Sequence, residues 1–267
     1  MKETQEQIQS MDAIGALPAV KNKKVLIFDL DGTLAESKTD MTPETAALLA
    51  RLLEKKRIAV IGGGKYELFE RQLVKQLMPR TRLENLFLFP TNSTVFYRYE
   101  NDAWKRVYAY FLTEDQKTKI ISAFEKAYEE TGYTHPSNLY GDILEDRGSQ
   151  VSFSAHGQLA PLEVKEKWNK ENDVRPQLME VLRKYLPEFE VRQGGLTTID
   201  ITMKGIDKAY GVEQIEKSLG VPIADMLFIG DALFPGGNDY AATKTGIDCL
   251  RVSGPSDTNR FIESLLD

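Results

Sequence analysis

Three aspartates follow apolar segments whose composition predicts buried strands. Asp29 and Asp31 end the segment VLIFDLD, and Asp231 ends the segment MLFIGD. Ligands of open α/β sheets bind beyond the carboxyl ends of the strands, so we expect these three carboxylates to meet there. Like charges at this spacing repel one another unless a divalent cation neutralises them, and an all-oxygen set of ligands favours Mg²⁺. The pattern therefore predicts a magnesium site.

Two glycine-rich segments accompany these strand ends. Gly62, Gly63 and Gly64 follow the segment RIAVI, where backbone N–H groups at a helix start can hold a phosphate. A tight strand-to-helix turn needs the same glycines, so the triplet alone leaves both interpretations open. Asn238 and Asp239 follow the segment PGG, which turns the chain back on itself. Because FIGD precedes this turn, we favour a functional loop over a plain surface turn.

Four segments together resemble the motifs of the haloacid dehalogenase-like superfamily of phosphotransferases. In chain order they are FDLDGT, IGGGK, GIDKAYG and FIGDALFPGGND. The last of them is similar to the longer form found in the phosphomannomutase branch, which carries a type IIB cap. The resemblance covers nearly all of the chain after about residue 23. It implies Mg²⁺ and an aspartyl-phosphate intermediate.

The resemblance also implies a role for each motif residue. Asp29 would be the nucleophile, and Asp31 the general acid and base that protonates the leaving oxygen and later deprotonates the acceptor. Lys208 would neutralise the nucleophile and the transferring phosphoryl group, although a lone lysine on an amphipathic helix is usually solvated. Asn238 would position neighbouring groups. The metal ligands implied are Asp29, Asp31, Asp231 and Asp239, the last of them directly or from outside the coordination shell.

Two segments of the middle region, EDRGSQVSF and GGLTTIDIT, resemble the substrate-binding stretches of the same branch. Arg147 would then clamp the remote phosphate of the substrate, because a planar guanidinium suits phosphate bidentately. Thr198 and Asp200 would contact sugar hydroxyls. These assignments depend on the motif, since a single arginine is more often a solvated or ion-paired surface residue.

The chain departs from that branch at one informative place. The animal-type cap has a second arginine in a Gly-Arg-Ser segment, whereas here Gly157 is followed by Gln158, and a further upstream arginine has no match in HPSNLYGDI. A mutase must hold phosphate at either end of the sugar while a bisphosphate turns around. A weaker clamp on the distal phosphate would favour escape of the bisphosphate or hydrolysis of the phosphoryl group. This departure therefore bears on mutase activity and not on the phosphoryl-transfer step.

The order of strands and helices predicts the elements that position these residues. Apolar strands alternate with amphipathic helices at both ends of the chain, which indicates a parallel α/β sheet covered on both faces. The middle has alternating aromatic strands around Asn101-Asp102, a capping box at Thr113 and Gln116, and a helix from about residue 175 to 185. We therefore expect a Rossmann-like core (21–91 and 204–267), an inserted α+β cap (92–203), and an N-terminal extension (1–20), frayed or a short docking helix.

Composition narrows the remaining alternatives. The 267 residues carry 34 basic and 40 acidic side chains, a net charge of 34 − 40 = −6, so no global basic field attracts nucleic acid or an anionic membrane. A single cysteine excludes an intramolecular disulfide framework and a structural zinc site. No apolar run approaches the roughly 20 residues of a membrane span, and no signal peptide is evident. We expect a cytoplasmic enzyme.

The function most consistent with these features is Mg²⁺-dependent phosphoryl transfer on a hexose phosphate. It would be most like a phosphomannomutase, which interconverts mannose 6-phosphate and mannose 1-phosphate and could need a hexose bisphosphate activator. One alternative is a sugar-phosphate phosphatase. Another is a catalytically silent sugar-phosphate binding protein, which the complete set of three aspartates and Lys208 argues against. We expect a sugar phosphate as partner, no nucleic acid and no membrane, and a homodimer through the aromatic cap sheet.

Overall fold

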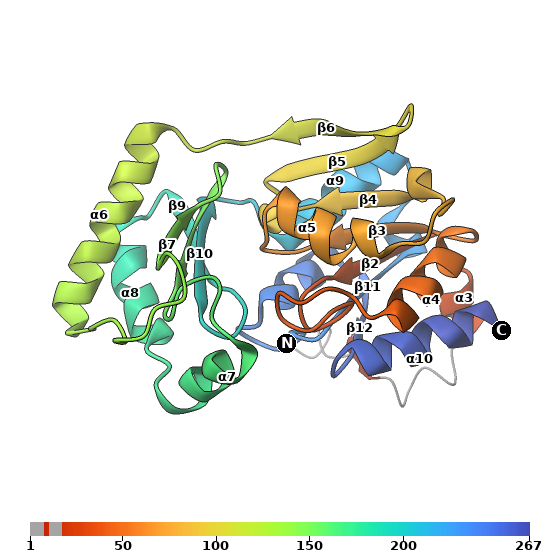
Figure 1. Ribbon diagram of the computed structural model, residues 1–267. Coiled ribbons are helices and arrows are strands. Elements are labelled where there is room, and N and C mark those ends of the chain that lie inside the picture. The colour runs from red at the N-terminus through yellow and green to blue at the C-terminus, as the bar shows by residue number, and fades with distance from the viewer. Residues whose placement is uncertain (1–7, 11–17) are drawn as a thin grey trace. The chain divides into compact units, whose positions relative to one another are not determined.

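The computed structural model describes residues 8–10 and 18–267, which form two compact units (Figure 1). The first, here called the core unit, comprises Met1–Tyr108 and Asp207–Asp267. The second, the cap unit, comprises Ala109–Ile206. The chain thus leaves the core unit, builds the cap unit and returns.

The core unit is built on an eight-stranded sheet. Six adjacent strands of this sheet, β1, β12, β11, β2, β3 and β4, run parallel to one another. Strand β5 pairs with β4 in the antiparallel sense. In spatial order the strands are β1 (Ile8–Ser10), β12 (Asp248–Arg251), β11 (Met226–Gly230), β2 (Val25–Asp29), β3 (Arg57–Ile61), β4 (Leu86–Phe89), β5 (Val95–Glu100) and β6 (Ala103–Ala109). This mixed but mostly parallel sheet confirms the predicted Rossmann-like class.

Continuous apolar strands explain why helices cover both faces of this sheet. All five residues of β2 are buried. Successive side chains of a strand point to opposite faces, and Leu26 and Phe28 pack in one apolar cluster while Val25 and Ile27 pack in the other. The core helices are α3 (Pro18–Lys21), α4 (Pro43–Leu53), α5 (Tyr66–Gln72), α9 (Lys208–Leu219) and α10 (Pro255–Leu266).

Short 3-10 helices connect several of these elements. They are η1 (Val74–Gln76), η2 (Leu83–Asn85), η3 (Thr91–Ser93), η4 (Ile223–Asp225) and η5 (Asn238–Thr245). The last of them begins with Asn238 directly after the PGG turn, so the glycine-rich loop that follows Asp231 ends in a helical segment. This loop returns Asp239 toward the strand ends.

Two segments differ from the expected domain boundaries. The hairpin of β5 and β6 belongs to the core sheet, with Leu88 paired to Tyr97, although we expected the cap to span all of residues 92–203. Alternating aromatic residues predict a hairpin but do not specify the sheet that it joins. Residues 8–10 of the expected extension form β1, an edge strand beside β12. Residues 1–7 and 11–17 lie outside the described part.

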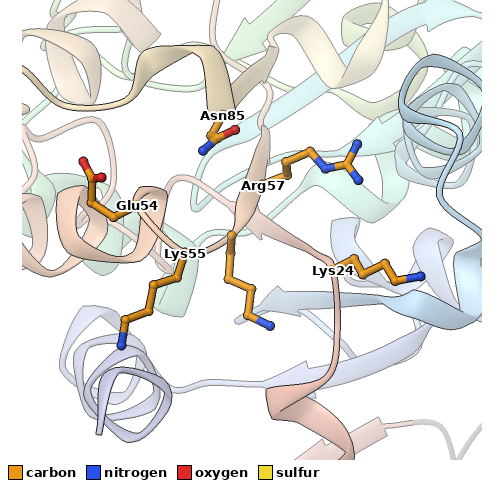
Figure 2. Close-up of a pocket in the computed structure, with 6 residues that line it drawn as sticks. Lys24, Glu54, Lys55, Arg57 and Asn85 are labelled. Atoms are coloured by element: carbon orange, nitrogen blue, oxygen red, sulfur yellow. The ribbon is translucent and has the colours of Figure 1, made fainter.

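A basic pocket lies at the amino ends of β2 and β3, at the opposite edge of the sheet from Asp29 (Figure 2). Figure 2 shows the side chains of Lys24, Lys55 and Arg57 pointing away from one another. Most of the polar groups here bind the last carbonyl of a helix. These donor and acceptor pairs are Lys55 and Leu266 of α10, Arg57 and Leu219 of α9, Lys56 and Lys21 of α3, and Asn85 and Leu53 of α4.

The charges of this pocket have a structural role. The carbonyl ends of helices carry partial negative charge, which a nearby cation stabilises. In a sheet of parallel strands joined by helices, the carboxyl ends of the helices gather at the amino edge of the sheet. The pocket is therefore a set of helix caps and is separate from the chemistry at the carboxyl edge.

We expect Lys56→Met to lower the free energy of unfolding by about 1 kcal/mol. Lys56 Nζ donates to the carbonyls of Lys21 and Lys23 at 2.6 Å each, and burial lowers the pKa of Lys56. Urea denaturation measures the change. Lys75→Met serves as the control, because Lys75 is exposed and pairs with Glu70 on the surface, so its loss should cost less than about 0.5 kcal/mol. Equal stability of the two variants would contradict the capping role.

The cap unit is a four-stranded antiparallel sheet with helices on one face. Its strands, in spatial order, are β7 (Leu144–Asp146), β8 (Gln150–Ser154), β10 (Thr198–Met203) and β9 (Phe189–Gln193). Its helices are α6 (Glu114–Thr131), α7 (Leu162–Glu171) and α8 (Arg175–Tyr185). Thr113 and Gln116 form the predicted capping box at the start of α6. Helix α7 was not predicted.

The two faces of the cap sheet differ in polarity. Phe153, Ile199 and Ile201 point to one face and pack with the cap helices. The alternate residues of the same strands, including Ser152 and Asp200, are polar and buried. Ser152 and Asp200 are cross-strand partners, and the Ser152 hydroxyl donates to the Asp200 carboxylate. A hydrogen-bonded polar face on one side of a small sheet is suited to recognising hydroxyl groups.

Candidate active site

The register of the core sheet brings two of the predicted aspartates together. Strands β2 and β11 are parallel neighbours, with Phe28 paired to Ile229. Asp29 is therefore opposite Gly230, and Asp231 comes one residue later on the adjacent strand. Because both chains leave the sheet at its carboxyl edge, the two carboxylates lie side by side at the place where α/β proteins bind ligands.

Gly32 allows the turn after Asp31 to pass close to Asp231. Its φ of +89° is left-handed, and a Cβ at this position would lie 2.7 Å from Asp231 Oδ2. A side chain here would thus be strained and would also collide with the carboxylate. The short distance between this turn and Asp231 explains why FDLDGT has a glycine at position 32.

Lys208 is the buried cation of the site. It is the first residue of α9, and the preceding Asp207 caps that helix by accepting from the N–H of Tyr210. Lys208 Nζ donates to Asp29 Oδ1 at 2.5 Å and to Asp239 Oδ1, and only 2% of the residue is exposed. Burial alone would lower the pKa of Lys208, but the two carboxylates more than offset this and raise it. The lysine is therefore held protonated.

Asp239 orients its neighbours with both carboxylate oxygens. Oδ1 accepts from Lys208, and Oδ2 accepts from the backbone N–H of Ala232 at 2.9 Å. The residue is fully buried. A Cβ on Gly230 would lie 2.3 Å from Asp239 Oδ2, so the glycine of FIGD provides the space for this carboxylate. Asp239 thus ties the PGGND loop to the lysine and to the end of β11.

The carboxylates of the site repel one another in a buried setting. Burial, followed by the charges of Asp239 and Asp231, raises the pKa of Asp29, against the opposing effect of Lys208. Burial and Asp239 raise the pKa of Asp231 to about 6. Since the folded state then binds more protons than the unfolded state, the Asp231 contribution to stability decreases as the pH rises toward about 6. A bound cation would offset this cost.

The site fits a divalent cation by its donor set. One oxygen from each of Asp29, Asp231 and Asp239 lies within 4.8 Å of the others. Asp29 Oδ2 is buried and has no hydrogen-bond partner among the described residues. A buried carboxylate oxygen without a donor is costly, and a hard cation with oxygen ligands, such as Mg²⁺, would satisfy it. Asp29 and Asp231 are best suited to direct contact, because Lys208 and Ala232 already engage Asp239.

The side chain of Asp31 does not belong to this metal-binding group. Asp31 Oδ1 accepts from the backbone N–H of Lys38 at 2.6 Å and from Gln72 Nε2 at 3.1 Å. The side chain is partly exposed, whereas Asp29 is buried. The structure thus separates the two aspartates of the motif, and side-chain ligation of the metal by Asp31 stays a prediction without support from this geometry.

The glycine triplet forms the turn between β3 and α5. The N–H of Gly62 donates to Phe89 O at 3.3 Å, so this amide is engaged with the neighbouring strand. The carbonyls of Gly62 and Gly64 accept from Asn92 and Thr91. Phosphate binding by Gly62, Gly63 and Gly64 stays a prediction. Asn238 lies half-buried at the start of η5.

Two of the predicted substrate residues of the cap unit, Arg147 and Asp200, lie in one polar cluster. Arg147 Nε donates to Glu145 at 2.8 Å, its Nη2 donates to Gln158 Oε1 at 2.9 Å, and its Nη1 lies 3.9 Å from Asp200. Only 5% of the Arg147 side chain is exposed. Thr198 lies on the same strand as Asp200, in β10. The guanidinium is thus enclosed by two carboxylates and an amide, a pairing with Gln158 that the sequence did not reveal.

A comparison with protein families finds that the model of eukaryotic phosphomannomutases matches residues 45–267. The phosphomannomutase of Saccharomyces cerevisiae is 28% identical over 225 residues, which cover 82% of this chain and 85% of that protein. The phosphomannomutase of Encephalitozoon cuniculi is 26% identical, over 91% of this chain and 94% of its own length. Human phosphomannomutase 1 is 26% identical, over 85% and 86% of the two chains.

Solved structures support the same fold at lower identity. The IMP-nucleotidase of Plasmodium falciparum superposes with a TM-score of 0.68 and 18% identity, over 96% of this chain and 71% of that one. The trehalose-6-phosphate phosphatase of Aspergillus fumigatus gives a TM-score of 0.51 and 16% identity, over 92% and 93%. At these identities the similarity concerns the fold alone. Within residues 8–10 and 18–267, no helix has the length and apolar character of a membrane span.

Proposed function

Because this chain belongs to the eukaryotic phosphomannomutase family, we propose that it transfers the phosphoryl group of a hexose phosphate through Asp29. The chain is a phosphotransferase of the haloacid dehalogenase-like superfamily, and the family is named for a mutase. The observation that carries the assignment is the buried Asp29, with Oδ1 held by Lys208 and Oδ2 without a hydrogen-bond partner in the described part of the chain. One oxygen is thus fixed, and the other is left for chemistry.

Lys208 prepares Asp29 for attack on phosphorus. Its ammonium group favours the ionised carboxylate, which burial and the neighbouring carboxylates disfavour. In the first half-reaction, Asp29 forms a bond to phosphorus while the bond from phosphorus to the sugar oxygen breaks. Mg²⁺ held by Asp29 and Asp231 would supply positive charge against the phosphoryl oxygens.

Asp31 would act as the general acid and base. When the bond from phosphorus to the sugar oxygen breaks, the electron pair stays on that oxygen, and Asp31 donates a proton to it. In the second half-reaction Asp31 takes a proton from the acceptor hydroxyl, which attacks the phosphorus of the aspartyl phosphate. Within the described part of the chain, no residue donates to Asp31 Oδ2, so this oxygen is the one suited to proton transfer.

The acceptor decides between a mutase and a phosphatase. Family membership favours the mutase, in which the sugar monophosphate itself accepts the phosphoryl group and a hexose bisphosphate activator primes the enzyme. A specific observation favours a phosphatase as the second candidate. Arg147 already pairs with Glu145 at 2.8 Å and lies 3.9 Å from Asp200, so carboxylates of the cap unit partly neutralise its charge. This environment suits sugar hydroxyls better than a second phosphate dianion.

Incubation of mannose 1-phosphate with Mg²⁺, with and without glucose 1,6-bisphosphate, separates the two candidates. A mutase should produce mannose 6-phosphate, faster with the bisphosphate, and little free phosphate. Predominant release of phosphate, insensitive to the bisphosphate, would instead identify a phosphatase. Arg147→Ala tests whether the guanidinium contacts the substrate. If it does, the substitution should raise KM and change kcat little. The cytoplasmic location and the cap-to-cap homodimer stay predictions.

A further inference from the structure

Gln72 is a fully buried polar side chain that no motif explains. It is the last residue of α5, and its exposed fraction is 0%. Its Nε2 donates to Asp31 Oδ1 at 3.1 Å and to the carbonyl of Thr39 at 2.6 Å. Two acceptors face this atom, so the amide orientation is determined by chemistry: the reverse orientation would set three oxygens against one another.

The carbonyl oxygen of the same amide lowers the stability of the folded protein. Gln72 Oε1 is buried and has no hydrogen-bond partner among the described residues. An unsatisfied buried acceptor destabilises a folded protein, and an apolar side chain of similar volume would avoid this cost. Packing therefore does not account for a glutamine at this position, whereas donation to Asp31 does.

Helix α5 also holds the loop that makes the second contact with Asp31. The carbonyl of Gln72 accepts from the N–H of Met41, and Arg71 Nη2 donates to the carbonyl of Lys38 at 2.8 Å. These contacts secure residues 38–41 against the end of the helix. Lys38, whose φ is +58°, in turn directs its N–H to Asp31 Oδ1. Both donors to Asp31 therefore depend on the last turn of α5.

We propose that Gln72 is a positioning residue for phosphoryl transfer: it fixes the Asp31 carboxylate so that Oδ2 faces the leaving oxygen of the substrate. This proposal rests on the acid and base role of Asp31 proposed above. Both contacts fall on Oδ1, which determines the side-chain rotamer and leaves Oδ2 available. Without Gln72 the carboxylate keeps the backbone contact but gains rotational freedom, and general acid catalysis is sensitive to such misplacement.

Leaving groups of different acidity test this role. A sugar alkoxide needs a proton as it departs, whereas p-nitrophenolate departs without one. With phosphate release as the readout and no bisphosphate present, each substrate is the phosphoryl donor, and kcat/KM covers only the steps up to departure of the leaving group. The ratio then isolates this proton transfer. We expect Gln72→Leu to lower kcat/KM for mannose 6-phosphate by about 10-fold to 100-fold, and that for p-nitrophenyl phosphate by less than about threefold.

Two further variants control for structure. Gln72→Met keeps the length and approximate volume of the side chain but removes the donor, and it should show the same selective loss. Gln76→Leu is the matched control, because Gln76 Nε2 donates to the carbonyl of Arg71 and does not contact Asp31; its kcat/KM values should stay close to those of the parent protein. Circular dichroism checks that the variants fold.

The outcomes separate this proposal from the proposed function. Equal losses on both substrates, no loss on either, or failure of both Gln72 variants to fold would overturn the positioning role. Asp31→Asn is measured alongside. If this variant shows no dependence on the leaving group, the acid and base role of Asp31 fails, and with it the premise; if it shows the dependence and Gln72→Leu does not, only the positioning role fails.

Discussion

Asp29→Asn should abolish turnover of hexose phosphates, with a loss of at least about 10⁴-fold in kcat. An amide cannot form the aspartyl phosphate, and it also removes one oxygen ligand from the proposed Mg²⁺ site. The fold should survive, because Lys208 keeps its contact with Asp239 and the substitution removes one of several crowded charges. We expect the melting temperature to fall by less than about 4 °C. Steady-state kinetics and thermal unfolding measure the two effects.

Asp225→Asn is the matched control for this substitution. Asp225 pairs with Lys24 on the surface, at the amino edge of the sheet, away from the site. Its replacement should leave kcat unchanged. Retention of more than about one hundredth of the parent activity by Asp29→Asn, at an unchanged melting temperature, would refute Asp29 as nucleophile.

Lys208→Met should both inactivate and destabilise the protein. Lys208 is the cation that contacts Asp29 and Asp239, and all three residues are buried. Removing one partner of a buried ion pair leaves uncompensated charge, which costs about 3–5 kcal/mol. Because excess negative charge remains at the site, Mg²⁺ should raise the stability of this variant more than that of the parent protein. Urea denaturation with and without Mg²⁺ measures both effects.

Lys244→Met provides the comparison for that experiment. Lys244 pairs with Asp207, next to Lys208, at 3.4 Å, but 68% of its side chain is exposed. A pair of this kind contributes less than about 1 kcal/mol. Were Lys208→Met no more destabilising than Lys244→Met, the buried cation would not have the electrostatic role that its contacts indicate.

The central part of the site was predictable because its residues follow from strand order. An aspartate at the end of an apolar strand lies at the carboxyl edge of a parallel sheet, and Asp29 and Asp231 meet because β2 and β11 are neighbours. Lys208 needed the motif as well, since nothing in its own helix distinguishes a buried lysine from a solvated one. The structure supplies that distinction through the contacts of its ammonium group.

The parts that were missed depend on contacts that local patterns do not encode. The hairpin of β5 and β6 alternates as a cap strand would, but pairing with β4 places it in the core unit. Helix α7 buries only Lys165 and Trp168, so its apolar period is too weak to recognise. Gln72 lies 41 residues after Asp31, and their contact depends on the loop that α5 secures. The pairing of Arg147 with Gln158 likewise joins two segments outside the strands, the turn between β7 and β8 and the loop after β8.

The most direct test of the account is to trap the covalent intermediate. The protein is mixed with mannose 1-phosphate and Mg²⁺, quenched and treated with hydroxylamine, which converts an acyl phosphate to a hydroxamate. Cleavage after Lys24 and Lys38 yields the peptide VLIFDLDGTLAESK, in which fragmentation by mass spectrometry distinguishes the two aspartates. The account predicts modification of Asp29. Modification of Asp31 or Asp231 instead, or turnover without any acyl phosphate, would contradict it.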